Sequence, residues 1–525
     1  MTDPAPPSRW AAVERRPALA ACAVALVVLA IALAAIDPLP VGVVHDDGMY
    51  VVLAKSIATG HGYRWLHLPG MPAATHFPPG YPLLLALVWA VFPAFPANVL
   101  AFKALNAVLL AGAAAAMLLL AHRRLGFSVR GAALVALLGC ASIPSLVLSS
   151  LVMSETLFLT LVLLSLLLAE RLVEAPAPLW RYAALGLLVG AVTLVRTHGL
   201  ALAVAVVFAL ALRRRWRHAS AFAVALLAAV APWQVWERMH AASVPAALRG
   251  DYGSYGGWLA GGFAANGFAL ALHTLARTSV DVFATVTTLV GAGLPTAARL
   301  VAGVGLVALG VLGAVRVWAR AGTTVAFLCV YLAIVLLWPF SPARFLWAVW
   351  PIVVALAGRG VLEIAKWRPA VSALRGARVL AAGGAALVVL GYGIYTARGY
   401  RGRWWSSIPR QMASAVKPLV QWTERNTRPD DVVASNAELL LYLYTGRSAV
   451  PATELSVGDY FHAPSVAANA RVLRDILSAY HVDAVAIVAN DSLAAAARTL
   501  TAARPPELVL RDSIPNGLIL ASALR

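Results

Sequence analysis

The chain has 525 residues, of which 61% are hydrophobic and only 12% are charged, and its mean hydropathy is +0.79. About a quarter of the residues of a soluble globular protein are charged, so this composition excludes an ordinary soluble enzyme and predicts a polytopic α-helical membrane protein. The 42 Lys and Arg residues outnumber the 23 Asp and Glu residues and give a net charge of +19. Such a charge indicates a nucleic-acid-binding surface only if the Lys and Arg residues are not simply those of the cytoplasmic loops of a membrane protein.

Eleven segments are apolar enough to be predicted as transmembrane helices, which need about 20 apolar residues each. They are 17–36, 99–121, 131–148, 151–169, 182–196, 198–212, 219–236, 299–317, 323–340, 345–362 and 379–396. The apolar core of the first segment is longer than that of a signal peptide, so we interpret it as a retained anchor. The stretch 278–298 contains Asp281, Gly293 and Pro295, which predict a helix that lies on the surface or re-enters partway.

The distribution of Lys and Arg predicts the orientation. If the N-terminus is cytoplasmic, the predicted inner segments hold nineteen of these residues, and the predicted outer segments before residue 397 hold nine. Eleven spans then place residues 397–525 outside the cytoplasmic (inner) membrane. The positive charge therefore follows topology, and we expect the lipid bilayer, not nucleic acid, as a partner.

Two long outer segments interrupt the predicted spans, at 37–98 and at 237–298. In the first of them, apolar residues recur at helical spacing over 47–59, which predicts a helix along the membrane interface. The prolines Pro78, Pro79 and Pro82 fix the backbone before the chain re-enters the membrane.

The composition changes after residue 396, and we divide the chain into a membrane domain, 1–396, and a small α/β domain, 397–525. The predicted helices of this second domain are 409–426, 436–445, 465–480 and 492–503, and its predicted strands are 432–434, 483–488, 507–511 and 517–521. Without a Gly-rich phosphate loop, a nucleophile elbow or a metal-ligand cluster in its sequence, this domain is interpreted as structural or substrate-shaping.

Asp46 and Asp47 form an adjacent acidic pair in an acid-poor protein, directly before the predicted interfacial helix. Such residues often cap a helix. A carboxylate near a low-dielectric surface can also act as a general base toward a hydroxyl, and a pair can hold a divalent cation such as Mg²⁺ or Mn²⁺. The sequence leaves these alternatives open.

Four further polar residues lie at predicted outer junctions. His76 precedes the prolines and is either a phosphate donor or a polar interfacial anchor. Arg196 and Arg344 interrupt apolar stretches, where a guanidinium either pairs with an acid or binds a phosphate. Glu155, at the outer end of a span, is placed either to pair with Arg196 or to contact substrate.

All these residues are predicted on the outer side, although they come from distant parts of the chain. A transporter more typically places polar groups at mid-membrane on broken helices within repeated halves, and neither feature is evident in the sequence. The pattern favours an outward-facing enzyme that holds a lipid-anchored substrate. A transporter or flippase of a lipid-linked envelope substrate is the alternative, and a non-catalytic envelope scaffold is a third.

Several of these short motifs occur together in one known group of membrane enzymes. They are Asp46-Asp47-Gly48-Met49-Tyr50, Pro78-Pro79, Met153-Ser154-Glu155-Thr156, Leu194-Val195-Arg196 and Arg344-Phe345. Together they resemble the GT-C glycosyltransferases, a superfamily that includes the bacterial aminoarabinose transferases and the protein O-mannosyltransferases. The resemblance covers roughly residues 1–396.

The resemblance implies that a sugar is transferred from a polyprenyl-phosphate donor to a glycan, lipid or protein acceptor outside the membrane, with inversion. It implies that Asp46 is the base and that Asp47 orients the acceptor or holds the cation. It further implies that Arg196 and Arg344 bind the lipid phosphate. The remaining residues of the predicted substrate site are Tyr50, His76, Glu155 and His198.

Two positions depart from the pattern of these enzymes. His76 stands where some members have lysine, and histidine is mostly neutral at pH 7. Asp47 replaces a more common glutamate and reaches one methylene less far.

Overall fold

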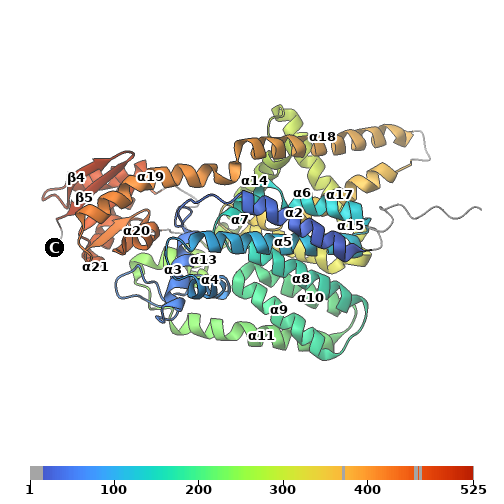
Figure 1. Cartoon of the computed structure of the whole chain (residues 1–525), viewed down its shortest axis with the longest axis horizontal. Coiled ribbons are helices and arrows are strands. Elements are labelled where there is room, and N and C mark those ends of the chain that lie inside the picture. Colours follow the sequence, from blue (N-terminus) through green and yellow to red (C-terminus); the bar gives the residue numbers. More distant parts are fainter. Residues whose placement is uncertain (1–15, 369–372, 455–458, 460–463, 524–525) are drawn as a thin grey trace, which may run out of the picture.

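The computed structural model describes residues 16–368, 373–454, 459 and 464–523. Apolar helices form the larger part of the molecule and run roughly along its long axis (Figure 1). The main ones are α2 (Pro17–Ala34), α5 (Val99–Arg123), α6 (Val129–Cys140), α7 (Ile143–Ser150), α8 (Glu155–Glu174), α9 (Leu179–Val195), α10 (Leu200–Leu212), α11 (Trp216–Met239), α14 (Phe268–Gly291), α15 (Thr296–Leu337), α17 (Trp350–Lys366) and α18 (Ala373–Gly402).

Large aliphatic side chains lie exposed on the outside of this helical region. Leu26, Leu227 and Val379 have 66%, 64% and 70% of their surface exposed. In a lipid bilayer such side chains contact hydrocarbon, and the helical backbone satisfies its own hydrogen bonds. The protein is therefore a multi-pass membrane protein with a polytopic helical domain.

Among the described residues, six helices are long and apolar enough to cross a membrane, or eight if each of two bent pairs counts as one span. Three shorter apolar helices accompany them. The predicted count of eleven spans is not confirmed by length and composition.

The longest helix, α15, covers two of the predicted spans, and its backbone is non-helical at Ala321. The Oε1 atom of Glu170, near the end of α8, accepts hydrogen bonds from the backbone N–H of Thr324, at 2.7 Å, and from its hydroxyl, at 2.8 Å. Because a backbone N–H in the middle of an uninterrupted helix bonds within the helix, this contact marks the start of a new helical segment. The two parts of α15 thus correspond to the predicted segments 299–317 and 323–340.

Shorter elements lie between the long helices and the C-terminal part of the chain, where Figure 1 places α3, α4 and α13. They are α3 (Asp46–Ala58), α4 (Gly80–Val91), η1 (Thr197–Gly199), η2 (Ala246–Leu248), α12 (Arg249–Tyr252), α13 (Tyr255–Asn266) and α16 (Ala343–Ala348). The helix predicted over 47–59 is α3, shifted by one residue. The helices α13 and α14 meet at an angle of 109°. The stretch 278–298, predicted to lie flat or re-enter, begins within α14 and ends at the start of α15.

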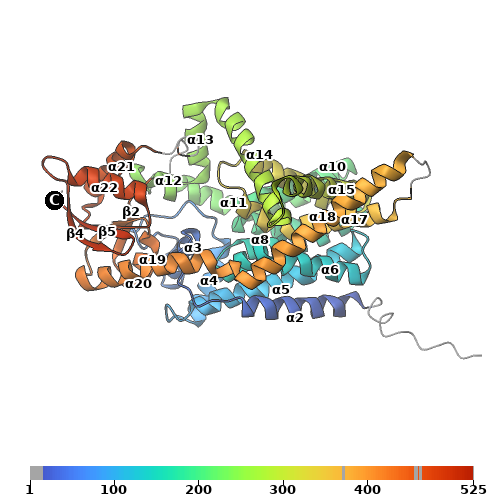
Figure 2. The same ribbon diagram turned by 90° about the horizontal axis from the view of Figure 1, so that it is seen from above.

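The C-terminal module, which we define as α19 to β5, is the α/β unit at one end of the molecule (Figures 1 and 2). Its helices are α19 (Trp404–Asn426), α20 (Glu438–Thr445), α21 (Val466–Tyr480) and α22 (Asp491–Thr501), and its strands are β1 (Val432–Ser435), β2 (Ser448–Pro451), β3 (Ala484–Val488), β4 (Leu508–Ile514) and β5 (Gly517–Ser522). The sheet has the order β2-β1-β3-β5-β4, with β1 parallel to β2 and β3 and the last two pairings antiparallel. The predicted α/β character is confirmed.

The strand β2 was not expected from the sequence. It has only four residues and ends at Pro451, which lacks the N–H that a central strand needs. Its position at the edge of the sheet explains why proline is tolerated there.

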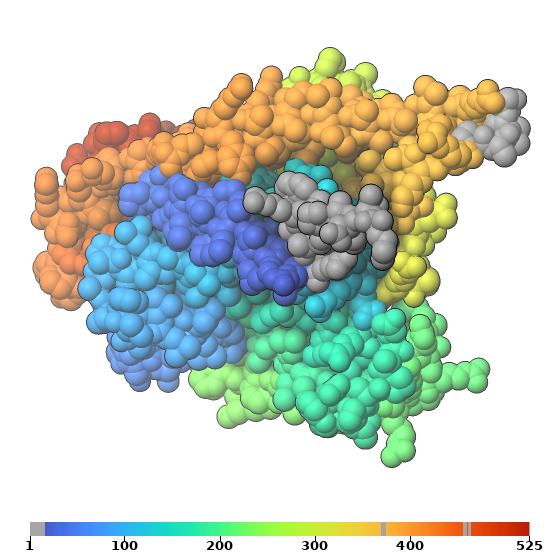
Figure 3. All heavy atoms as spheres, turned by 45° about the vertical axis from the view of Figure 1, so that its right-hand side comes forward, coloured from blue at the N-terminus to red at the C-terminus, as the bar shows by residue number. Residues whose placement is uncertain are grey.

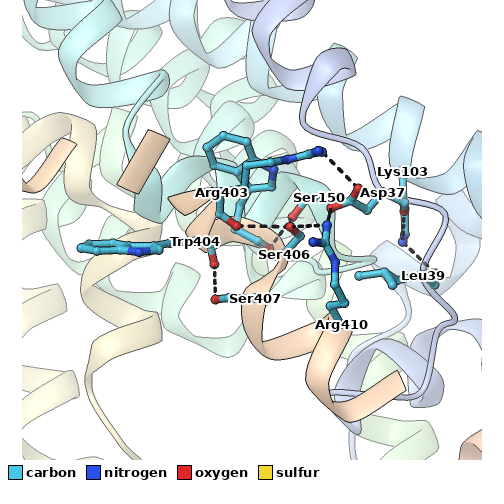
Figure 4. Close-up of polar contacts among 10 residues, drawn as sticks. Asp37, Leu39, Lys103, Ser150, Arg403, Trp404, Ser406, Ser407 and Arg410 are labelled. Carbon is cyan, nitrogen blue, oxygen red and sulfur yellow. Dashed lines mark hydrogen bonds and ion pairs between the residues drawn. The ribbon is translucent and has the colours of Figure 1, made fainter. Parts of the chain in front are cut away.

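The helix α18 continues through the predicted domain boundary at 396/397 and is followed by α19, so that the two helices lead along the molecule to the module (Figure 2). In Figure 3, α18 runs along the top of the molecule, above the N-terminal helices. Asp37, just after α2, holds this connection: its carboxylate pairs with Arg403 at 3.1 Å and with Arg410 at 3.2 Å (Figure 4).

The backbone at the same place is bound by a buried lysine. Lys103 of α5 donates hydrogen bonds from Nζ to the carbonyl oxygens of Asp37 and Leu39, at 2.9 Å each (Figure 4). These bonds fix the chain where it leaves α2 and enters the segment that carries Asp46.

Replacing Lys103 with methionine should destabilise the protein by about 2–3 kcal/mol, because two partly buried carbonyl groups lose a charged donor. Thermal unfolding of the purified protein in detergent measures the change. Lys417→Met, at an exposed position of α19, is the matched control. Equal unfolding temperatures for the two variants would contradict the assigned role of Lys103.

Candidate active site

A cavity of about 760 Å³ lies where the helical region meets the C-terminal module. Six of the eight residues predicted for the site line it, although they are separated by up to 298 positions in the chain. They are Asp46, Tyr50, His76, Arg196, His198 and Arg344. The other two, Asp47 and Glu155, lie behind its surface.

Four charged groups form one connected cluster at this cavity. Arg344 pairs through Nη2 with Asp46 Oδ2 at 2.6 Å and through Nε with Glu155 Oε1 at 2.6 Å. The same oxygen of Glu155 lies 3.0 Å from Nη1 of Arg196. Glu155 therefore sits between two guanidinium groups, and the two acids and two bases of the cluster cancel in charge.

The cluster has an accessible front and a buried back. The side chains of Arg344 and Asp46 are 28% and 22% exposed, whereas those of Arg196 and Glu155 are 8% and 0% exposed. A bound molecule can therefore reach Arg344 and Asp46 more easily than Arg196 and Glu155.

Neutral hydroxyls complete the back of the cluster. The hydroxyl of Ser154 accepts a hydrogen bond from Arg196 Nη1 at 3.0 Å and shares another with the buried hydroxyl of Tyr50 at 2.9 Å. Ser154 precedes α8, so one short stretch supplies both the hydroxyl and the carboxylate that hold Arg196.

Asp46 stays ionised despite its surroundings. Burial by itself would raise the pKa of its carboxyl, but the charge and hydrogen bond of Arg344 outweigh burial and hold the pKa below its ordinary value. The carboxylate therefore can accept a proton at neutral pH, provided that a donor hydroxyl approaches from the cavity.

Asp47 is oriented differently from its neighbour. Its Oδ2 accepts a hydrogen bond from the backbone N–H of Gly42 at 2.9 Å, and its Oδ1 accepts one from that of Val44 at 3.1 Å. Both oxygens thus bind the chain that precedes α3 rather than face the cavity, although burial raises the pKa of this carboxyl.

His76 lines the cavity, and one of its ring nitrogens is bound to the backbone. Its Nδ1 donates to the carbonyl oxygen of Gly253 at 2.7 Å, and burial lowers the pKa of the ring to about 4. At neutral pH the ring is therefore uncharged, and its Nε2 is an acceptor. Such a nitrogen suits a hydroxyl group better than a phosphate.

Aromatic and aliphatic side chains form most of the remaining wall. The ring of His198 stacks on Phe345 with centroids 4.7 Å apart, and the guanidinium of Arg196 lies 5.3 Å from the centroid of the same ring. Beyond them the lining includes Val147, Leu148, Trp338, Phe340, Trp404, Trp405 and Ile408.

The sequence analysis did not assign several of these residues to the site. Trp404, Trp405 and Ile408 belong to the start of α19 and reach the cavity only because α18 leads the chain back toward it. Ser154 lies within a motif that was identified in the sequence, but a single serine carries no signal of its own.

The residues at the acidic pair do not fit a divalent cation. Asp46 is bound to Arg344, and both oxygens of Asp47 accept backbone hydrogen bonds. Within the described ranges, no group of three or more His, Cys, Asp or Glu side chains is arranged to hold a metal ion.

No known family model matches the chain, and no curated protein sequence matches it. Solved structures do. The crystal structure of ArnT from Cupriavidus metallidurans bound to undecaprenyl phosphate is 15% identical with a TM-score of 0.51, and the match covers 98% of each chain. The archaeal oligosaccharyltransferase AglB from Archaeoglobus fulgidus, in complex with an inhibitory peptide and a dolichol-phosphate, is 13% identical with a TM-score of 0.51, over 89% of this chain and 69% of that chain.

The chain has the GT-C fold. The structural match with ArnT includes the C-terminal module, because it extends over nearly the whole length of both proteins. The predicted resemblance is therefore confirmed at the level of the fold.

The carboxylate oxygens of Asp46 and Asp47 are already bound to other groups of the protein. We therefore expect that excess EDTA does not change the rate of any sugar transfer that the protein catalyses, and that added Mg²⁺ or Mn²⁺ does not raise this rate. The measurement is the initial rate of the purified protein before and after chelation. A rate that falls with EDTA and returns with one of these cations would show that the reaction needs a cation and would contradict this expectation.

Proposed function

We propose that the protein is a glycosyltransferase that transfers a sugar from a polyprenyl-phosphate-linked donor to a hydroxyl of a glycan, lipid or protein acceptor. One observation carries this proposal: an ionised carboxylate and a guanidinium lie side by side at the polar end of a cavity that is otherwise largely apolar. The carboxylate suits an acceptor hydroxyl, the guanidinium suits a phosphate, and the apolar wall suits a lipid chain.

The proposed reaction is a single displacement at the anomeric carbon. The acceptor oxygen forms the new bond to this carbon, the bond from the carbon to the phosphate oxygen breaks, and the acceptor proton passes to Asp46. The lipid phosphate leaves with one additional negative charge. Attack from the face opposite the leaving group inverts the configuration.

The charged cluster balances this movement of charge. Before the reaction, Asp46 and Glu155 together neutralise Arg196 and Arg344. When Asp46 takes the proton it becomes neutral, so Arg344 loses one counter-charge as the leaving phosphate gains one. A guanidinium that is already in place stabilises this developing charge without first having to be reoriented.

Arg344 is assigned to the phosphate itself, because it is the more exposed of the two arginines. Glu155 and Arg196 hold its position from behind, and Tyr50 and Ser154 in turn hold Arg196. In this assignment His76 accepts a hydrogen bond from a sugar or acceptor hydroxyl through Nε2 and does not bind the phosphate.

The protein is placed in the cytoplasmic membrane with its N-terminus in the cytoplasm and the module and cavity outside. The excess of Lys and Arg in the predicted inner segments supports this orientation. It also fits a reaction that needs no nucleotide.

A membrane-impermeant thiol reagent should label the variant Glu424→Cys, at an exposed position of α19, in intact cells. Labelling of this position only after lysis would mean that the orientation is the reverse.

The function is tested by incubating the purified protein with undecaprenyl-phosphate-linked hexoses and pentoses, and with membrane lipids and glycans as the source of acceptor. Mass spectrometry should detect free undecaprenyl phosphate together with an acceptor that has gained one sugar. Donor that crosses a vesicle membrane with its covalent structure intact, and no new product, would instead support the flippase alternative.

The two adjacent aspartates should respond differently to the same substitution. Asp46→Asn should lower transfer by about 100- to 10,000-fold, as expected for removal of a general base. Asp47→Asn should destabilise the protein by about 1–3 kcal/mol, because a backbone N–H loses its acceptor. Undiminished turnover in Asp46→Asn would eliminate the proposed base.

A further inference from the structure

The helix α20 of the C-terminal module packs directly on the backbone that carries Asp46. Two glycines permit this approach: a Cβ atom built on Gly42 would lie 2.9 Å from Cβ of Leu440, and one built on Gly48 would lie 2.9 Å from Cβ of Leu439. Either distance is too short for a real side chain. Gly42 also has φ of +90°, a conformation that other residues rarely adopt.

His45, immediately before the proposed base, has a strained backbone. Its φ and ψ are 66° and −69°, and the N–H of Asp46 bonds to the carbonyl oxygen of Val44 at 2.9 Å across it. These values define a classic γ-turn, which is rare and strained. Such a conformation persists only where the surrounding structure enforces it.

The side chain of His45 is held by the module. Its Nε2 donates to Oε1 of Glu438, the first residue of α20, at 3.0 Å, and the hydroxyl of Tyr252 donates to the same oxygen at 2.7 Å. The side chain of Glu438 is 2% exposed. A second contact fixes the start of the segment, where the N–H of Val41 donates to the hydroxyl of Tyr444 at 3.2 Å.

The segment 41–48 is therefore fixed from two sides. Asp47 binds its backbone from within through Gly42 and Val44, and α20 binds it from outside through Glu438. Asp46 projects from the end of this segment to Arg344. A change in the turn at His45 would move the carboxylate of Asp46 relative to the guanidinium.

The ionisation of the pair is consistent with a strong contact. The surrounding protein would lower the pKa of His45, but the hydrogen bond and charge of Glu438, with smaller contributions from Asp251 and Asp46, raise it to about 9. The pKa of Glu438 is lowered, because the hydrogen bond and charge of His45 outweigh burial. The pair is thus complete below the ordinary pKa of histidine, near 6.5, and is lost as pH rises through about 9.

We propose that Glu438 is a positioning residue for the reaction: through His45 it holds the γ-turn that aims Asp46 at the acceptor and at Arg344. The C-terminal module then supplies part of the active-site framework. This inference rests on the proposed function, and it goes beyond that function by assigning the module a role in turnover.

The test compares Glu438→Gln with the matched control Glu424→Gln, which changes an exposed glutamate of the same module. We expect kcat to fall about 100-fold in Glu438→Gln, as a misplaced catalytic group can cost, while KM for the polyprenyl-phosphate sugar stays nearly constant. The alkaline limit of activity should also move to lower pH, because His45 loses its counter-charge. Glu424→Gln should match the wild type in all three.

A double substitution tests whether Glu438 acts through His45. If it does, His45→Asn combined with Glu438→Gln should be no slower than His45→Asn alone. Independent, multiplying effects of the two substitutions would overturn the proposal, because they would mean that Glu438 supports the fold by another route.

Hydrogen exchange of the full-length protein provides a measurement that does not depend on activity. Glu438→Gln should increase exchange of the amides of residues 41–48 and leave the strand β3 protected, whereas unfolding of the module would expose both. Wild-type protein without transfer activity would refute the proposed function. Active wild-type protein with a Glu438→Gln variant that matches it in kcat, pH limit and exchange would refute only the positioning role.

Discussion

The arrangement of this protein depends on the neutralisation of charge at the edge of an apolar helical region. Arg196 is almost fully buried and Glu155 is fully buried, and an isolated charge in such surroundings is strongly unfavourable. Each group is tolerated because the other is within 3.0 Å, and the pair extends to Arg344 and Asp46. Four segments distant in the sequence are thereby required to meet at one place, and that place is the polar end of the cavity.

The same constraint suits the site to the proposed reaction. Arg344 and Asp46 lie on the cavity side of the charged cluster, and each has about a quarter of its side chain exposed. In the proposed reaction, a phosphate that approaches Arg344 competes with Asp46 and Glu155 for the same guanidinium, and protonation of Asp46 favours the phosphate. Ion pairing thus offsets the buried charges before a substrate binds, and in the proposed reaction proton transfer releases the guanidinium when charge develops on the leaving group.

The sequence was sufficient to predict the groups that carry charge and those that follow regular patterns. The apolar segments, the helix after Asp46 and most elements of the module have a periodicity or composition that indicates them directly. An arginine within an apolar stretch, such as Arg196, is conspicuous because it is costly there. By contrast, residue type and local pattern do not distinguish Asp46 from Asp47, and only the family resemblance assigned them different roles. Their different orientations arise from the γ-turn at His45 and from two backbone N–H groups that Asp47 binds.

The role of α20 was beyond prediction for a related reason. Glu438 begins an otherwise apolar stretch, Leu-Leu-Leu-Tyr-Leu-Tyr, and a charged residue at a helix start is ordinarily interpreted as a favourable partner for the helix dipole. Its actual partner, His45, lies 393 residues earlier, and the contact exists only because Gly42 and Gly48 allow the helix to approach the backbone. A long-range contact of this kind combines small residues on one segment with a charged residue on another. Neither segment by itself shows in the sequence that the contact exists. An acidic residue at the start of an apolar helix in a C-terminal module therefore becomes informative only together with a glycine-flanked acidic pair elsewhere in the chain.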